Sequence, residues 1–310
     1  MAVSPPTSRA SASAGPRRAP SGDGAGRVPQ EQRQRSLEIV RNLTAREVRT
    51  QFKRTAFGRA WSFINPIATL AILSLVFGLF IRVPFEPSRN SDLQLFVIFL
   101  AAALIPWNFM SGAITAGMSS LVVNAGLLTK VYFPRYVLPT SVILSMSLTF
   151  AIEMGVLLTV VAVLGGPGVL VFVPGILLFM LLIAAFAIGV AMTLSIAMVY
   201  FRDTQHIMGI FMQLWFYATP IIYPLTLITV DVQNRLDEGG WTVFGQPIPL
   251  ETLYMLNPAA AFTGAFRTMI YDYAWPSLGQ LLTCVVWTAL ALGVGLLVFR
   301  RFSARVVEEL

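Results

Sequence analysis

Few side chains in this 310-residue sequence could carry out catalytic, metal or nucleotide chemistry. Its two lysines, Lys53 and Lys130, lie outside any glycine-rich phosphate loop, so ATP hydrolysis by that route is excluded for this chain. The single histidine, His206, has no cysteine beside it, and the single cysteine, Cys284, lies in an apolar run. We therefore predict a protein that is not an enzyme, with no catalytic residues, no metal site and no cofactor of its own.

Glu153 is the one ionisable residue deep inside an apolar stretch long enough to cross a membrane. A carboxylate in lipid is costly and usually marks a functional or packing site. It could be a protonated acid bonded to a neighbouring helix, or a group in a wet pathway such as an ion-coupled carrier needs. A proton relay normally uses several acids, so a structural role for this intramembrane acid is the favoured hypothesis.

Aromatic side chains offer a second kind of chemistry, because their faces can stack on the apolar faces of sugar rings. Aromatic residues also form ordinary belts at the membrane surface, and composition alone favours that interpretation. Some of the candidates lie near the outer ends of predicted membrane spans, and the others lie within spans. The candidates are Phe77, Phe80, Trp107, Trp215, Phe216, Tyr217 and Tyr223.

Long uncharged runs define the elements that position these residues. Met154 to Phe201 contains no Asp, Glu, Lys or Arg over 48 residues, which is not expected in a soluble domain. A crossing needs about 20 apolar residues, so this run predicts two helices joined by a tight turn. The whole chain predicts an all-α integral membrane protein with six transmembrane helices. Their expected ranges are 61–81, 94–118, 136–164, 170–200, 207–223 and 278–299, with a re-entrant or interfacial piece at 119–134 and a polar loop at 224–272.

The remaining segments flank this domain, which is expected over residues 60–300. Residues 1–30 are rich in Ala, Ser, Pro, Gly and Arg, and we predict a disordered cytoplasmic tail because they cannot bury enough apolar surface. Residues 31–59 repeat apolar positions at helical spacing with arginines between them. This pattern predicts an amphipathic interface helix on the membrane surface, with an ordinary solvated helix as the alternative. Residues 301–310 are expected to form a cytoplasmic C-terminal tail.

The net charge of +7 is explained by membrane topology rather than by nucleic acid. Of the 22 lysines and arginines, 18 fall in segments that six spans place on the inner side of the membrane, and 4 on the outer side. Cytoplasmic segments of membrane proteins carry this kind of excess. We therefore predict that both termini are cytoplasmic, that the protein is multi-pass in a bacterial plasma membrane, and that it has no nucleic-acid partner.

Four stretches carry a more specific pattern. They are residues 52–58 with Trp61 and Asn65-Pro66, residues 130–135 with Leu138-Pro139, residues 200–224, and Asn257-Pro258. Together they resemble the ABC-2 type polysaccharide-export permeases of the Wzm and teichoic acid exporter group. The most distinctive stretch combines Arg202-Asp203 at a helix junction with a span that ends in an aromatic, Pro, Tyr and Pro pattern. The resemblance covers residues 37–300.

The resemblance implies a homodimer of six-span subunits with two separate ATPase subunits, which would bind ATP and magnesium. The loops expected to contact the ATPase contain Lys130, Tyr132, Phe133, Arg135, Arg202, Asp203 and His206. The path between the two subunits would carry a lipid-linked glycan outward through membrane lipid, with the aromatic candidates lining or gating it. The lysine-poor, Arg- and Pro-rich composition is similar to that of actinobacterial proteins, which suggests galactan as the cargo. An ABC-2 drug or lipid exporter and an ion-coupled carrier are the alternatives.

Overall fold

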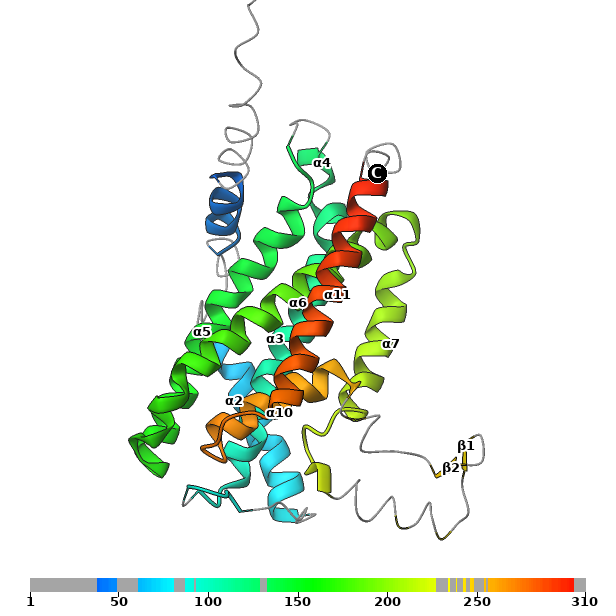
Figure 1. Ribbon diagram of the computed structural model, residues 1–310. Helices are drawn as coiled ribbons and strands as arrows, with labels where there is room; N and C mark the ends of the chain where they lie inside the picture. Colours follow the sequence, from blue (N-terminus) through cyan, green and yellow to red (C-terminus); the bar gives the residue numbers. More distant parts are fainter. Residues whose placement is uncertain are drawn as a thin grey trace, which may run out of the picture.

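The computed structural model describes residues 38–48, 61–80, 87–91, 93–128, 133–226 and 256–303, together with residues 234, 238, 242–243, 246–247 and 254. Helices form nearly all of this part of the chain (Figure 1). Its only sheet is an antiparallel ribbon of β1 (Thr242–Val243) and β2 (Gln246–Pro247). The all-α prediction is therefore confirmed. The predicted tail at 1–30 and most of the predicted tail at 301–310 lie outside the described residues.

Among the described residues, four helices are long and apolar enough to cross a membrane. They are α3 (Phe96–Val123), α5 (Val137–Gly165), α6 (Val173–Tyr200) and α11 (Leu278–Phe302). Even the shortest, α11 with 25 residues, rises about 37 Å, which exceeds a hydrocarbon core of about 30 Å. The third, fourth and last predicted spans agree closely with α5, α6 and α11.

The central helix of the bundle is α3, which packs against α5, α6 and α10. It continues to Val123, past the predicted end of the second span, and Asn124 separates it from the short α4 (Ala125–Leu128). The prediction that a re-entrant piece begins at residue 119 is therefore wrong, because an uninterrupted apolar helix extends through that point. Pro106 lies within α3, as membrane helices tolerate when neighbouring helices surround the break.

The first predicted span is helical but divided into two parts. α2 (Trp61–Leu73) continues as the π-helix η2 (Ser74–Phe80). Longer runs of π-helix are rare, and π-helical turns occur frequently at functional sites. Apolar side chains such as Ile67, Ile72 and Leu79 are exposed on this element. Such a face suits contact with lipid or with another apolar helix.

The fifth predicted span, 207–223, is not confirmed as one full-length helix. α7 (Thr204–Tyr217) has 14 residues and rises about 21 Å, which is too short to cross a bilayer. The chain leaves the helix at Ala218 and bends through Pro220. Figure 1 shows α7 standing on one side of the bundle.

The predicted polar loop at 224–272 contains a buried helix, so this prediction also needs correction. α10 (Pro258–Ile270) packs against α3, α6 and α11, and Phe262 and Phe266 have no exposed surface. It crosses the lower end of the bundle in Figure 1. Neither α7 nor α10 is as long as the four apolar helices above, so six full-length spans are not confirmed among the described residues.

A tight turn at Gly166 joins α5 to the 3-10 helix η3 (Pro167–Phe172), as the uncharged run predicted. Gly166 has a φ of 87°, a left-handed conformation that glycine adopts without strain. The Tyr273 hydroxyl donates a hydrogen bond to the Gly166 carbonyl oxygen at 3.1 Å. Burial raises the pKa of Tyr273, so its hydroxyl stays protonated and available as a donor at neutral pH. The turn is therefore held to the segment between α10 and α11.

The helices α6 and α11 pack tightly, and their backbones meet at two glycines. A Cβ atom on Gly189 would lie 2.3 Å from the Ala291 carbonyl carbon, and one on Gly295 would lie 2.4 Å from the Gly189 oxygen. Small residues allow membrane helices to approach in this way, because no hydrophobic force draws them together within lipid. These two glycines therefore set the separation of α6 and α11.

Residues 38–48 form a helix, in agreement with the centre of the amphipathic helix predicted at 31–59. Its apolar side chains Ile39, Val40 and Leu43 pack against a cluster that includes Leu121 and Leu138. Arg46 donates a hydrogen bond of 2.8 Å to the side-chain oxygen of Asn124. The helix is thus attached to the ends of α3 and α5. The rest of the predicted range lies outside the described residues.

Candidate functional site

The bundle has two ends, and we describe each candidate residue by the end at which it lies. The α4 end contains α4, the α6–α7 junction and the C-terminal end of α11, at the top of Figure 1. The α10 end is opposite. Arg202 lies at the α6–α7 junction, and Arg300 and Arg301 lie in the last turn of α11. The basic residues of the α4 end are consistent with the side of the membrane predicted to be cytoplasmic.

Three of the predicted aromatic residues gather near the C-terminal end of α7. The ring centroid of Trp107 lies 5.7 Å from those of Trp215 and Phe216, with an edge-to-face arrangement against Trp215. Phe211 extends the cluster, 5.4 Å from Trp215. Such pairs stabilise contacts beyond the area that they bury. Trp107 is only 4% exposed, so within a single chain it anchors α7 to α3 rather than lining an open path.

Asn257 connects this aromatic cluster to the start of α10. Its side-chain oxygen accepts hydrogen bonds from the Trp215 indole at 2.8 Å and from the Ala259 backbone at 3.0 Å, where it caps the helix. Its amide group donates to the Ala218 carbonyl oxygen and to the Thr219 hydroxyl, both at 3.3 Å. One side chain thus holds the end of α7 and the beginning of α10 together. The sequence analysis singled out Asn257-Pro258 as part of a family pattern, but it did not predict the hydrogen-bond partners of Asn257.

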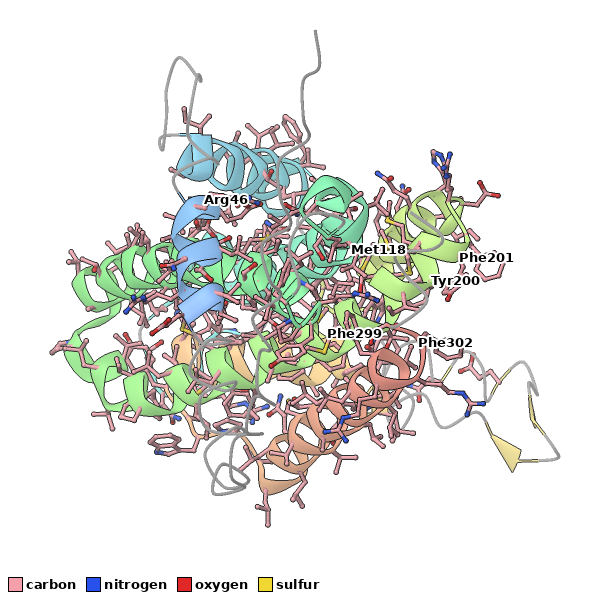
Figure 2. All side chains as sticks on the ribbon, turned by 90° about the horizontal axis from the view of Figure 1, so that it is seen from above. Arg46, Met118, Tyr200, Phe201, Phe299 and Phe302 are labelled. Atoms are coloured by element: carbon pink, nitrogen blue, oxygen red, sulfur yellow. The ribbon has the colours of Figure 1, made fainter. Side chains whose placement is uncertain are left out.

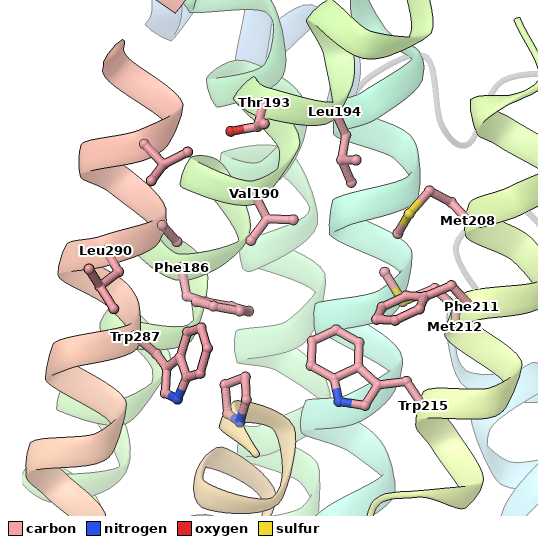
Figure 3. Close-up of a pocket in the computed structure, with 13 residues that line it drawn as sticks. Phe186, Val190, Thr193, Leu194, Met208, Phe211, Met212, Trp215, Trp287 and Leu290 are labelled. Atoms are coloured by element: carbon pink, nitrogen blue, oxygen red, sulfur yellow. The ribbon is translucent and has the colours of Figure 1, made fainter. Parts of the chain in front are cut away.

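A groove of about 510 Å³ separates α7 from α6 and α11 (Figure 3). Figure 3 shows Trp215 and Trp287 on opposite walls, with Phe186 between them. The Trp287 indole donates to the Leu256 carbonyl oxygen at 2.8 Å, and the Trp215 indole is held by Asn257. The polar atoms of these walls are therefore already paired. The groove presents ring faces and hydrocarbon rather than hydrogen-bonding groups.

Of the other aromatic candidates, only Tyr217 contacts this cluster, edge-to-face on Phe216 with ring centroids 5.3 Å apart. Phe77 and Phe80 both lie on η2, where Phe77 packs against the core and Phe80 is 71% exposed. Tyr217 is exposed at the end of α7. The Tyr223 hydroxyl donates to the Tyr217 carbonyl oxygen at 2.7 Å and lies 3.5 Å from the Tyr254 hydroxyl. The exposed rings of Phe80 and Tyr217 remain available for contacts outside the chain.

Arg267 is a site residue that the sequence analysis missed, because it was assigned to a polar loop. It lies on α10, half-buried, with its guanidinium 3.8 Å from the centre of the Phe99 ring. It donates to the Phe99 carbonyl oxygen at 3.3 Å, to that of Pro220 at 2.9 Å and to that of Ile221 at 2.6 Å. Carbonyl groups in such bends need donors from elsewhere. Arg267 therefore joins α10, α3 and the segment after α7.

Glu153 lies half-buried on α5, next to the exposed side chain of Ile152. No hydrogen bond or ion pair joins its carboxyl group to any residue of the described chain. The hypothesis of an acid bonded to a neighbouring helix is thus not supported by contacts within one subunit. The described spans also provide no second acid for a proton relay.

The loop between α6 and α7 presents charge at the surface. Arg202 and Asp203 in the loop and His206 in the first turn of α7 are all exposed, as a contact with another protein requires. Asp203 precedes α7 and Thr204 begins it, and the Thr204 hydroxyl donates to the Phe201 carbonyl oxygen. The loop is therefore short and locally braced.

The second predicted contact loop is different, because its two described candidate residues, Phe133 and Arg135, are not exposed. Phe133 is 7% exposed and packs in the cluster with Leu121, Val137 and Phe299. Arg135 is half-buried. Lys130 and Tyr132 lie outside the described residues. Phe133 therefore anchors this loop to the bundle instead of reaching outward.

Comparisons with known proteins show that the sequence is similar to membrane transport proteins. Residues 39–233, more than half of the chain, match the family described as ABC-2 type transporter. The chain is 27% identical over 240 residues to the O-antigen export system permease protein RfbA of Myxococcus xanthus, which covers 77% of this chain and 82% of that protein. It is 26% identical over 281 residues to a protein of the same name from Klebsiella pneumoniae, which covers 88% of this chain and 95% of that protein. The family match includes both Arg202-Asp203 and Trp215.

Proposed function

The chain belongs to the ABC-2 type transporter family, and on that premise we propose that it is the permease subunit of an ATP-driven exporter for a lipid-linked polysaccharide. The observation that carries the proposal is its similarity, over most of its length, to proteins named as O-antigen export permeases. Such a subunit provides the membrane path and leaves ATP hydrolysis to a separate protein. The absence of a phosphate loop from the sequence supports this division.

The partner subunit is an ATPase that binds ATP and magnesium and docks at the α6–α7 loop. The exposure of Arg202, Asp203 and His206 supports this role, because charged surface groups steer and orient a transient contact. We further propose that two copies of this chain assemble in a bacterial plasma membrane. The exposed apolar side chains of α2 and η2 support a second copy as a neighbour.

The glycan path runs between the two copies beside α7 and η2. The exposed rings of Phe80 and Tyr217 support it, since aromatic faces can stack on sugars without fixing one arrangement of hydroxyl groups. A polymer in transit must not be held tightly at any single place. Galactan remains our specific hypothesis for the cargo, from the composition of the chain.

Depletion of this protein from its cell tests the cargo class. We expect a lipid-linked glycan to accumulate on the cytoplasmic side, because synthesis continues while the path is closed. Extraction of lipids followed by sugar analysis measures the accumulation and identifies the sugar. Restored expression of the same chain is the control. If no glycan accumulates, the protein exports a small drug or a lipid instead. If a polymer without galactose accumulates, the cargo is a polysaccharide but not galactan.

Reversal of charge at the α6–α7 loop tests the partner site. We expect Arg202→Glu and Asp203→Lys each to reduce ATP-dependent export at least about tenfold, because like charges brought together at an interface cost several kcal/mol. The helices should still fold, since both side chains are exposed. Export in vesicles and ATPase activity of the complex are the measurements. Arg89→Glu, an exposed arginine near the α10 end, is the matched control, and equal export in all variants contradicts the assignment.

A further inference from the structure

Arg135 is half-buried, but one nitrogen of its guanidinium group is buried and has no hydrogen-bond partner in the described chain. Its Nη1 nitrogen has almost no contact with solvent, and no acceptor lies within hydrogen-bonding distance. A buried donor without a partner is costly, and the cost is larger for a charged group. No acidic side chain forms an ion pair with it in the described residues. The described residues therefore supply neither an acceptor nor a counter-charge to this donor.

A cavity of about 440 Å³ lies at this guanidinium, between the start of α5 and the end of α11. Arg135 and Tyr136 line it on the α5 side, and Arg300 and Ser303 line it on the α11 side. Its described lining thus contains two arginines and two hydroxyl groups but no Asp or Glu. Arginine forks and hydroxyl groups are the usual donors to a phosphate group.

The deeper part of the same cavity is apolar. Leu296 and Phe299 line it, one turn of α11 before Arg300 and Ser303. Figure 2 looks onto this end of the bundle and shows Phe299 and Phe302 on the last turns of α11. Arg300 follows the long apolar part of α11, so it lies where the membrane interior gives way to water. A cavity with charged groups on one side and apolar groups on the other suits an amphiphile whose charge lies at the membrane interface.

We propose that this cavity binds the phosphate headgroup of an anionic phospholipid, with Arg135 and Arg300 as its cationic ligands. Basic pockets between membrane helices bind such headgroups, and each arginine near an anionic surface contributes about 1 kcal/mol. The acyl chain follows Leu296 and Phe299 into the bilayer. In this proposal Arg135 contacts lipid rather than the partner ATPase. The proposal does not depend on the cargo of the exporter.

The test is lipid dependence with a matched arginine control. The chain is purified with its partner ATPase and placed in nanodiscs of phosphatidylcholine with increasing phosphatidylglycerol. We expect native mass spectrometry to show retained phosphatidylglycerol, and Arg300→Gln and Arg135→Gln each to weaken retention by about fivefold or more. Arg301→Gln removes the same charge one residue away without lining the cavity, and it should retain the lipid.

Several outcomes would overturn the proposal. One is equal retention of phosphatidylglycerol and phosphatidylcholine, and another is an equal loss in Arg301→Gln. Saturation of the site by inorganic phosphate in the absence of charged lipid would identify a site for small anions. Normal lipid retention combined with loss of the ATPase from both cavity variants would identify a protein contact. Arg300 is exposed, so its variant should fold even if Arg135→Gln does not.

Discussion

A single methyl group at position 189 will destabilise the protein by about 3 kcal/mol, the largest effect that we expect from so small a change. The Cβ atom of Gly189→Ala would lie 2.3 Å from the Ala291 carbonyl carbon and 2.4 Å from the Leu292 nitrogen. These are backbone atoms, which cannot rotate away as a side chain does. The helices α6 and α11 must therefore separate, and the contacts along both helices weaken together.

The loss of stability is measured as the unfolding temperature in detergent, with size-exclusion chromatography as the readout of folded protein. Gly293→Ala is the matched control, because it lies on α11 and its added Cβ atom would meet nothing within 4 Å. Alanine also has the better helix propensity, so the control should be neutral or slightly stabilising. An unfolding temperature of Gly189→Ala equal to that of wild type would show that the two helices are not as close as described.

Loss of the Arg267 guanidinium is the second large effect. We expect Arg267→Met to destabilise the protein by about 3 kcal/mol and to abolish export, because three carbonyl oxygens lose their donor. Arg267→Lys should fail nearly as badly, since an ammonium group cannot reproduce three donors in the fixed plane of a guanidinium. Export in vesicles and thermal unfolding are the measurements.

The exposed Arg89 provides the control for this prediction. Arg89→Met removes a similar side chain near the same end of the bundle and should change the unfolding temperature little. Full export by Arg267→Lys would mean that charge alone suffices at this site. Wild-type stability of Arg267→Met would show that its hydrogen bonds contribute nothing net.

Sequence patterns predicted the parts of the fold that are governed by long apolar runs. α5, α6 and α11 were predicted well because a continuous apolar stretch of more than 20 residues has few stable alternatives to a membrane helix. The same rule failed for α7 and α10. An apolar stretch of 13 or 14 residues can be a buried helix or part of a crossing, and hydropathy does not distinguish the two.

The candidate site was predictable in composition but not in its connections. The aromatic residues at 215–217 and the charged pair at 202–203 were evident in the sequence. The bond between Trp215 and Asn257 joins residues 42 positions apart, and that between Arg267 and Phe99 joins residues 168 positions apart. Such pairs depend on how the helices fold back on one another. One sequence alone does not specify that arrangement at side-chain resolution.

Most side chains of α7 are not buried in the bundle, and this has a mechanical consequence. Met212 is the only buried side chain of α7, so little of the bundle restrains the middle of this helix. One end carries the charged loop at Arg202, and the other is fastened through Trp215 and Asn257 to α10. An unbroken helix behaves as a stiff rod at this length. The exposed loop and the end bonded to Asn257 are therefore joined by one unbroken helix and lie about 21 Å apart.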